Sequence, residues 1–305
     1  MAANDDFDPN QGHGDHVDCI SAAKNTEEFL SKWLPESVTG GELICSTAAP
    51  VACDLGDDAP KTAPILYIGK KDHPRFLTLI AVDKANERNL LMSGYPEYDG
   101  AEVEVKLRYI YEWADGIEAT LEGEVLGEAA HPIVFFDTRY AMNKGRYEIG
   151  KTYTFRISAF AYNACILPET EREFRFEGDK AVEHRKRMGY EQEYDQDGKP
   201  KPVIFNMEKL VAYLPKWGPY PDNAEFQSPV FGEIEEFSAF DSDFYRINIA
   251  VAREDSEVVV PLIAKKSFFA TKPRLNDPIR GIFWLQGYCL QEKSQSDHHE
   301  DPPAG

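Results

Sequence analysis

The feature that most constrains the fold is an alternation of apolar and polar side chains in two long blocks of the chain. In the first block, 101–167, apolar residues recur at every second position, as in Val103, Val105, Leu107 and Tyr109. A period of two is typical of a strand with one buried face, because successive side chains point to opposite faces of a sheet. The pattern resumes at Val230 and continues to Leu290. The sequence therefore predicts a mainly β protein.

The two blocks resemble each other over their last strands. The stretch 147–162, YEIGKTYTFRISAFAY, aligns without a gap with 273–288, PRLNDPIRGIFWLQGY. In both, a turn containing Gly or Asn, which tolerate a positive φ, precedes a long alternating strand. Blocks of about 65 residues with roughly five short strands resemble a small Greek-key barrel of the OB class. We expect tandem OB-like barrels over 101–167 and 229–290; adjacent β-sandwiches or a chance match of two β-segments are the alternatives.

The segments before the first block are expected to pack on it. Residues 1–20 are acidic and polar, and we predict that they are disordered. Within 21–100, apolar spacing predicts a short helix over 21–34 that Pro35 ends, followed by a hairpin at 65–82.

The segments after each block carry few apolar residues at regular spacing. Residues 168–228 are predicted to form an exposed linker with a short helix at about 206–214. The tail, 291–305, is polar and is predicted to be disordered.

Charge limits the classes of partner. The chain holds 33 Lys and Arg against 53 Asp and Glu, a net charge of -20, and nearly half of the excess lies in 1–62. This balance excludes a histone-like or ribosomal polycation. The folded middle is close to neutral, so a local basic groove for nucleic acid stays open. Mimicry of nucleic acid by the acidic N-terminal stretch is a further hypothesis.

The cysteines and the N-terminus indicate a reducing compartment. The five cysteines form no CxxC pair, and the first residues lack the apolar region of a secretory signal. No apolar run approaches the roughly 20 residues that span a bilayer. We expect reduced thiols, a cytoplasmic location and no membrane partner.

Catalytic signatures are missing from the sequence. There is no GxSxG, GxxxxGK[ST] or HExxH motif and no strand-placed GxGxxG. We therefore favour a protein that is not an enzyme and holds no cofactor. A catalytic site assembled through space stays open, and it would need a deep pocket that holds carboxylates or His184.

Two short clusters contain residue types that bind metals. They are HGDHVDC, which includes His13 and His16, and DHHED at 297–301. Imidazole, carboxylate and thiolate at such spacing hold Zn²⁺ or Ni²⁺ weakly. Both lie outside any predicted core that would fix their geometry, so we interpret them as polar tails and predict no metal site.

The segment 264–274, AKKSFFATKPR, is the best candidate for ligand binding. Basic groups track phosphates and aromatic faces stack bases, each stack contributing roughly 1–3 kcal/mol. In an OB-like barrel this segment would fall near the ligand-binding loop before the last strand. Alternatively, the two phenylalanines pack inside and the lysines are solvated. The candidate residues are Lys265, Lys266, Phe268, Phe269, Lys272 and Arg274.

Three large aromatic residues in the Pro-rich part of the linker are candidates for partner binding: Trp217, Tyr220 and Phe226. Either they cap a barrel or they anchor a protein partner, since Trp and Tyr dominate binding hot spots.

The function that these observations favour is a non-catalytic binding or assembly module that engages a protein partner through loops and strand edges. The alternative is single-stranded DNA or RNA binding through 264–274, and the third class is an enzyme whose site is not visible in the sequence. Salt separates the first two, because phosphate contacts make affinity fall steeply as salt rises.

Overall fold

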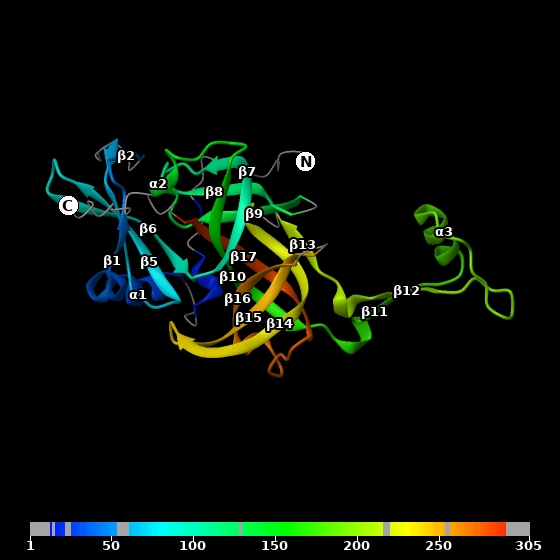
Figure 1. Cartoon of the computed structure of the whole chain (residues 1–305). Coiled ribbons are helices and arrows are strands. Elements are labelled where there is room, and N and C mark those ends of the chain that lie inside the picture. Colours follow the sequence, from blue (N-terminus) through cyan, green and yellow to red (C-terminus); the bar gives the residue numbers. More distant parts are fainter. Residues whose placement is uncertain are drawn as a thin grey trace, which may run out of the picture.

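Strands dominate the structure, as the alternating pattern predicts (Figure 1). The computed structural model describes residues 13, 16–21, 26–53, 61–127, 130–215, 220–253 and 257–290. Strands hold 54% of the residues and helices 16%, so the mainly β prediction is confirmed. Among these residues, no helix combines the length and the apolar character needed to cross a membrane.

The largest sheet joins strands from both alternating blocks. Within the described residues its strands are β7 (Ala101–Glu112), β8 (Ala119–Val125), β9 (His131–Asp137), β10 (Thr152–Ile166), β13 (Ala212–Pro215), β14 (Asn223–Ala239), β15 (Ser242–Arg253), β16 (Glu257–Lys265) and β17 (Pro278–Cys289). In this part of the chain, eight of the nine close into a ring. The last strands of the two blocks, β10 and β17, pair antiparallel with each other across the ring. This pair divides the ring into two smaller closed series of paired strands, here called cycles, and both β10 and β17 belong to each cycle.

Each cycle holds the strands of one block and the last strand of the other. β10 pairs antiparallel with β7 of its own block and parallel with β16 of the second block. In the same way, β17 pairs with β14 of its own block and with β9 of the first. The two blocks are thus interlocked through their last strands.

The pairing follows the internal similarity of the sequence. The gapless alignment places Ala159 over Leu285, and these two residues are partners in the β10–β17 pair. On either side, Ser158 faces Gln286 and Phe160 faces Trp284, so equivalent residues exchange places across this centre. This is the pattern expected of a local two-fold relation between the two last strands.

Hydrophobic packing lies on both sides of β17. Phe283 and Leu285 point into the core inside the ring. Trp284, between them, points into a second core that the ring shares with the N-terminal elements. Residues 282–285, IFWL, are apolar at successive positions because this strand is covered on both faces.

The N-terminal elements form a smaller sheet covered by a helix. Its strands, in the described part of the chain, are β1 (Glu42–Ser46), β4 (Ile65–Gly69), β5 (Arg75–Asp83) and β6 (Arg88–Glu97). β4 and β5 pair antiparallel, which confirms the predicted hairpin. Helix α1 (Thr26–Gly40) packs Phe29 against Phe76 of β5, with ring centroids 5.6 Å apart.

Short elements complete this half of the molecule. They are η1 (Val17–Cys19), β2 (Val51–Ala52), β3 (Thr62–Ala63) and α2 (Tyr140–Asn143). The predicted end of the first helix at Pro35 is wrong, because α1 runs through this residue to Gly40. Pro35 lies on the exposed face, where the loss of one backbone hydrogen bond is tolerated.

The predicted linker contains a projecting arm, residues 169–209 (Figure 1). The arm consists of η2 (Glu169–Glu171), β11 (Glu173–Phe176), α3 (Asp179–Met188), β12 (Val203–Asn206) and η3 (Met207–Lys209). β11 and β12 form an antiparallel ribbon that carries α3 away from the body.

The linker helix lies elsewhere than predicted. Residues 206–214 form η3 and the strand β13, whereas the helix is α3. Helix α3 is mostly polar, so it has no apolar stripe for periodicity to detect. Its local signals are Asp179 in the first turn, basic residues in the last turn and Gly189 at the C-terminal cap, with a φ of 73°.

A buried ion cluster ties the smaller sheet to the ring. The Glu97 carboxylate of β6 is fully buried, and Arg75 and Arg139 donate to it at 2.7–3.1 Å. The Thr138 hydroxyl donates to the same group at 2.8 Å. Burial alone would raise the pKa of Glu97, but the two guanidinium groups hold it at about 2.

We expect the Glu97→Gln variant to lose about 3–5 kcal/mol of unfolding free energy at neutral pH, because two buried guanidinium groups lose their counter-charge. The folded pKa of Glu97 lies below its ordinary value of 4.5, so its ionisation stabilises the fold above that pH. This stability is lost as the pH falls from 4.5 to 2, and the variant should lack that part of the dependence. Urea unfolding as a function of pH measures both, with Glu102→Gln at an exposed ion pair as the control.

Candidate functional site

The basic side chains of the predicted ligand-binding loop are engaged by the protein itself. Lys265, the last residue of β16, donates from Nζ to the carbonyls of Asp18 and Ser21 at 2.9 and 2.7 Å. Lys266 and Lys272 both pair with Glu236 of β14. The lysine side chains of this loop therefore bind the N-terminal segment and β14 to the body of the protein.

The aromatic side chains of the same loop pack inward. Phe269 is buried and contacts Tyr245 edge to face, and Phe268, in η4 (Lys266–Phe268), packs against the core inside the ring. The backbone N–H of Arg274 donates to Asp277, which shapes the following turn. The arrangement corresponds to the alternative in which the phenylalanines are structural.

The three candidate partner-binding aromatics occupy different surroundings. Trp217 lies outside the described residues. Tyr220 is half-buried beside the rings of His13 and His16, with centroids 5.3 and 5.2 Å away. Phe226 is buried in the core against Phe283 and presents no surface to a partner.

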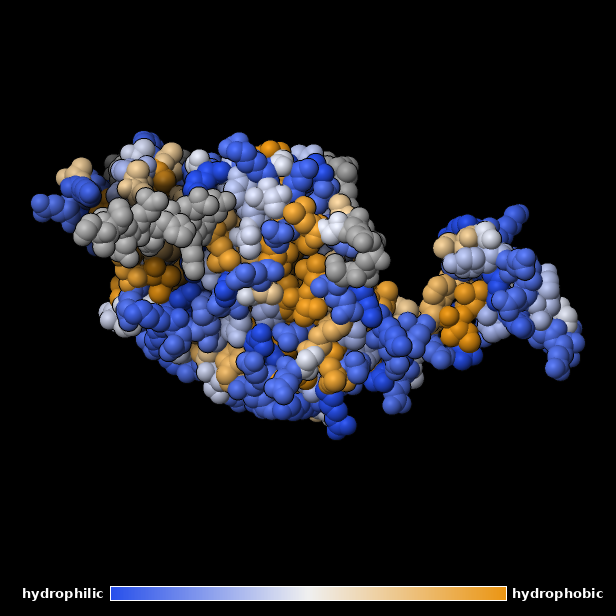
Figure 2. Space-filling model, viewed as in Figure 1, coloured by the Kyte–Doolittle hydropathy of each residue, from blue (hydrophilic) through white to orange (hydrophobic). Residues whose placement is uncertain are grey.

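The arm carries an exposed apolar surface (Figure 2). Among the described residues, six of the fifteen exposed large hydrophobic side chains lie in it: Phe174, Met188, Tyr190, Tyr194, Ile204 and Phe205. Figure 2 shows hydrophobic surface on the arm next to α3. Exposed apolar side chains gathered in one projecting segment are typical of sites of interaction with other molecules.

The arm has a defined internal structure that supports this surface. Phe176 stacks on His184 of α3, with centroids 4.8 Å apart, and Phe205 meets both rings edge to face. The Arg185 guanidinium is buried and donates to the carbonyls of Lys201 and Pro202. These contacts hold α3 on one face of the ribbon.

The charge of α3 differs from that of the whole chain. The helix has four basic residues, Lys180, Arg185, Lys186 and Arg187, against two acidic ones, Asp179 and Glu183. Helix α3 alone is therefore basic, whereas the loop that follows it, 189–202, holds four acidic residues and two basic ones.

A second feature, which the sequence did not predict, is a buried cluster of His13, His16 and Asp222. His13 Nε2 lies 3.0 Å from Asp222 Oδ2, and His16 Nε2 lies 3.2 Å from both ring nitrogens of His13. The side chains of His13 and Asp222 are fully buried. Burial, and next the neighbouring His13, hold the pKa of His16 well below its ordinary value, so this imidazole is neutral.

Sequence reasoning placed both histidines in a disordered stretch because it had no partner for them. Asp222 follows 206 positions after His16, in the segment before β14. The neighbouring residues Val17, Cys19 and Ile20 are fully buried. The only local signal is the HGDHVDC motif itself, and nothing in the chain pattern points from it to Asp222.

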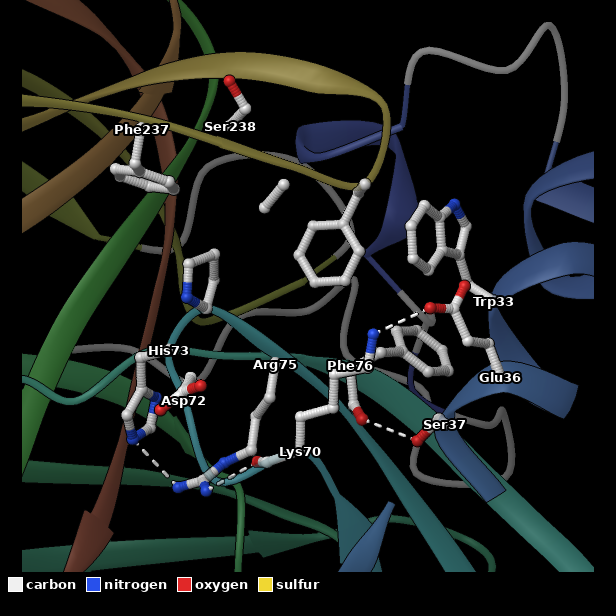
Figure 3. A pocket seen from close by; sticks show the side chains of 13 residues that line it. Trp33, Glu36, Ser37, Lys70, Asp72, His73, Arg75, Phe76, Phe237 and Ser238 are labelled. Carbon is white, nitrogen blue, oxygen red and sulfur yellow. Dashed lines mark hydrogen bonds and ion pairs between the residues drawn. The ribbon is translucent and has the colours of Figure 1, made fainter. Parts of the chain in front are cut away.

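A pocket of about 380 Å³ lies between α1, the β4–β5 turn and the β14–β15 turn (Figure 3). Trp33, Phe76 and Phe237 form its apolar walls. Two of its basic groups are engaged within the protein, since Lys70 pairs with Glu36, and Arg75 with the buried Glu97.

This pocket does not contain His184, which lies in the arm. The requirement stated for an enzyme, a pocket that holds carboxylates or His184, is met only by Glu36 and Asp72 at its rim. The pocket supports no named reaction.

We expect the Lys265→Ala variant to loosen the N-terminal segment, because Lys265 holds two of its carbonyls. Hydrogen bonds to a charged group contribute about 1.5–3 kcal/mol, so amide exchange at 17–21 should become at least about tenfold faster. Hydrogen–deuterium exchange by mass spectrometry measures this. Lys272→Ala, at an exposed ion pair, is the control and should leave these amides unchanged.

Comparison with known proteins adds no family to this description. No protein family model, curated protein or solved structure matches this chain. The function is therefore argued from the arm and the other features described above.

Proposed function

We propose that this protein is a non-catalytic binding or assembly module and that the arm is its principal contact with a protein partner. The observation that carries the proposal is the exposed apolar surface of the arm, held out from the body by the ribbon of β11 and β12 (Figures 1 and 2). Tyr190 and Ile204 are 61% and 49% exposed. When a partner covers such side chains, the burial of their apolar surface contributes favourably to the binding free energy.

The chemistry of the arm indicates its partner. Apolar side chains on the ribbon lie next to a basic helix, so the partner surface is apolar with acidic groups at its border. A second copy of this chain supplies acidic groups, since its net charge is -20. We therefore take self-assembly through the arm as the form of the proposal to test first.

Strand edges support the same function. Among the described residues, β11 and β12 pair only with each other, so each leaves one backbone edge available. An extended segment of a partner adds to such an edge through main-chain hydrogen bonds.

The proposal also includes the OB-like class of the two blocks and a cytoplasmic location. The paired cycles that share β10 and β17 support a tandem of OB-like units, here interlocked rather than separate. The five cysteines, which form no CxxC pair, support a reducing, cytoplasmic location.

We expect the double variant Tyr190→Ala/Ile204→Asp to weaken self-association at least about tenfold, since each lost hot spot costs roughly 1–2 kcal/mol. Sedimentation velocity over a range of protein concentrations measures the dissociation constant. Leu91→Asp, on β6 of the body and 54% exposed, is the matched control and should associate like the wild type. A wild type that remains monomeric at every concentration contradicts self-assembly.

Single-stranded nucleic-acid binding is the second candidate. It is favoured by Phe268, whose ring lies 5.5 Å from Lys265 Nζ, and by the neighbouring Lys272 and Arg274 at the surface. It is disfavoured by Glu236, because this carboxylate forms ion pairs with Lys266 and Lys272 and so competes with phosphate for both lysines. Because of this internal pairing, the first proposal is preferred.

The expected result for labelled single-stranded DNA and RNA is therefore no salt-sensitive binding, measured by fluorescence polarisation at low and physiological salt. Lys272→Ala/Arg274→Ala is the test variant, because both side chains are exposed and their loss should leave the fold intact. Binding that falls steeply with salt and is weakened in this variant would instead establish the second candidate.

A further inference from the structure

We infer that His13, His16 and Asp222 form a binding site for a divalent transition metal ion, with Zn²⁺ as the best match. The ion would join the N-terminal segment to the residue that precedes β14. The sequence prediction of no metal site rested on the lack of a core around His13 and His16. The structure supplies that core, since His16 and Asp222 are buried and the His13 side chain is fully covered.

The spacing of the ligand atoms carries the inference. One atom from each residue belongs to a set that lies within 4.8 Å of one another, and the closest separations are 3.0–3.3 Å. Zinc bonds of roughly 2.0–2.2 Å at tetrahedral angles place ligand atoms roughly 3.3–3.6 Å apart. The His13–Asp222 and His13–His16 contacts are thus within a few tenths of an ångström of this spacing, and the third pair, His16 and Asp222, needs to close by at most about 1.5 Å.

The ligand types fit the ion. Two imidazoles and one carboxylate form a nitrogen and oxygen set that suits Zn²⁺ and its neighbours in the first transition row, rather than Ca²⁺ or Mg²⁺. These three protein ligands leave a fourth position of a tetrahedral site for water or another small ligand.

Hydrogen bonds from neighbouring residues fix the orientation of Asp222 and His16. Trp284 Nε1 donates to Asp222 Oδ2, and the Thr120 hydroxyl donates to Oδ1 at 3.4 Å. The Tyr162 hydroxyl is hydrogen-bonded to His16 Nδ1, which leaves Nε2 for the metal. Such contacts are typical around metal ligands, where they fix the tautomer and the ring orientation.

Aromatic rings enclose the cluster and keep water away. His13 stacks on Phe136 with centroids 4.2 Å apart, and His16 stacks on Trp284 at the same distance. Trp113 and Tyr220 lie on the other sides of His13. A buried carboxylate needs a compensating positive charge in such surroundings, and a divalent ion provides it.

The rival account is a metal-free hydrogen bond between His13 and Asp222. It explains the 3.0 Å contact between these two residues. In that account His16 Nε2–H donates to His13 Nδ1 at 3.2 Å and extends the same chain of hydrogen bonds. The two accounts predict different results when metal is added.

The test uses the full chain, stripped with a chelator and titrated with Zn²⁺ or Co²⁺. We expect one ion per folded chain by mass spectrometry under native conditions, and visible absorption bands of tetrahedral Co²⁺. His13→Ala and His16→Ala should each weaken Zn²⁺ binding by at least about 100-fold, and Tyr162→Phe by about 10–100-fold. Circular dichroism confirms that each variant is folded.

Matched controls separate this site from other histidines. His298→Ala/His299→Ala removes the imidazoles of the DHHED cluster, and His73→Ala removes a half-buried histidine elsewhere. Both should bind Zn²⁺ like the wild type. Should the stripped chain bind no ion, or should binding persist in folded His13→Ala and vanish in the tail variant, the inference is overturned. The Asp222→Asn variant tests the third ligand. It should also weaken Zn²⁺ binding, provided that its circular dichroism is unchanged.

Discussion

The antiparallel pairing of β10 with β17 is the constraint on which the rest of the structure depends. These strands come last in their blocks, yet each also completes the cycle of the other block. Close approach is part of the arrangement: at Gly281 a Cβ atom would lie 2.1 Å from the Asn163 carbonyl oxygen, so only glycine fits. Because both faces of β17 are covered, Trp284 serves the second core while Phe283 and Leu285 fill the first. Formation of the whole ring thus requires contacts between residues more than a hundred positions apart.

Trp284 also connects the sheet to the buried histidine cluster. Its indole stacks on His16 and donates to Asp222, so the central strand, the N-terminal segment and the start of β14 meet at one side chain. Lys265, next along the ring at the end of β16, holds the carbonyls of Asp18 and Ser21. A segment that is acidic and polar in sequence is therefore built into the body. A metal ion at this place would act as a clamp, because its binding energy adds to the stability of the folded state.

The arm has the opposite physical character. Its ribbon is too small to be stable in isolation, and the aromatic contacts among Phe176, His184 and Phe205 supply what the strands lack. The remaining apolar side chains stay exposed, which gives the arm a surface that a partner can cover. Buried contacts therefore fix the fold of the body, whereas several apolar side chains of the arm stay exposed.

The sequence by itself determined the strand content, the hairpin of β4 and β5, and the likeness between 147–162 and 273–288, because these depend on local period and turn chemistry. It missed α3, which has no apolar stripe, and it ended α1 too early at Pro35. Only the tertiary structure decided that the blocks interlock, that Phe268 and Phe269 pack inward, and that His13 and His16 meet Asp222. The physical reason is sequence separation: local patterns specify which face of an element is buried, but not which distant element covers it.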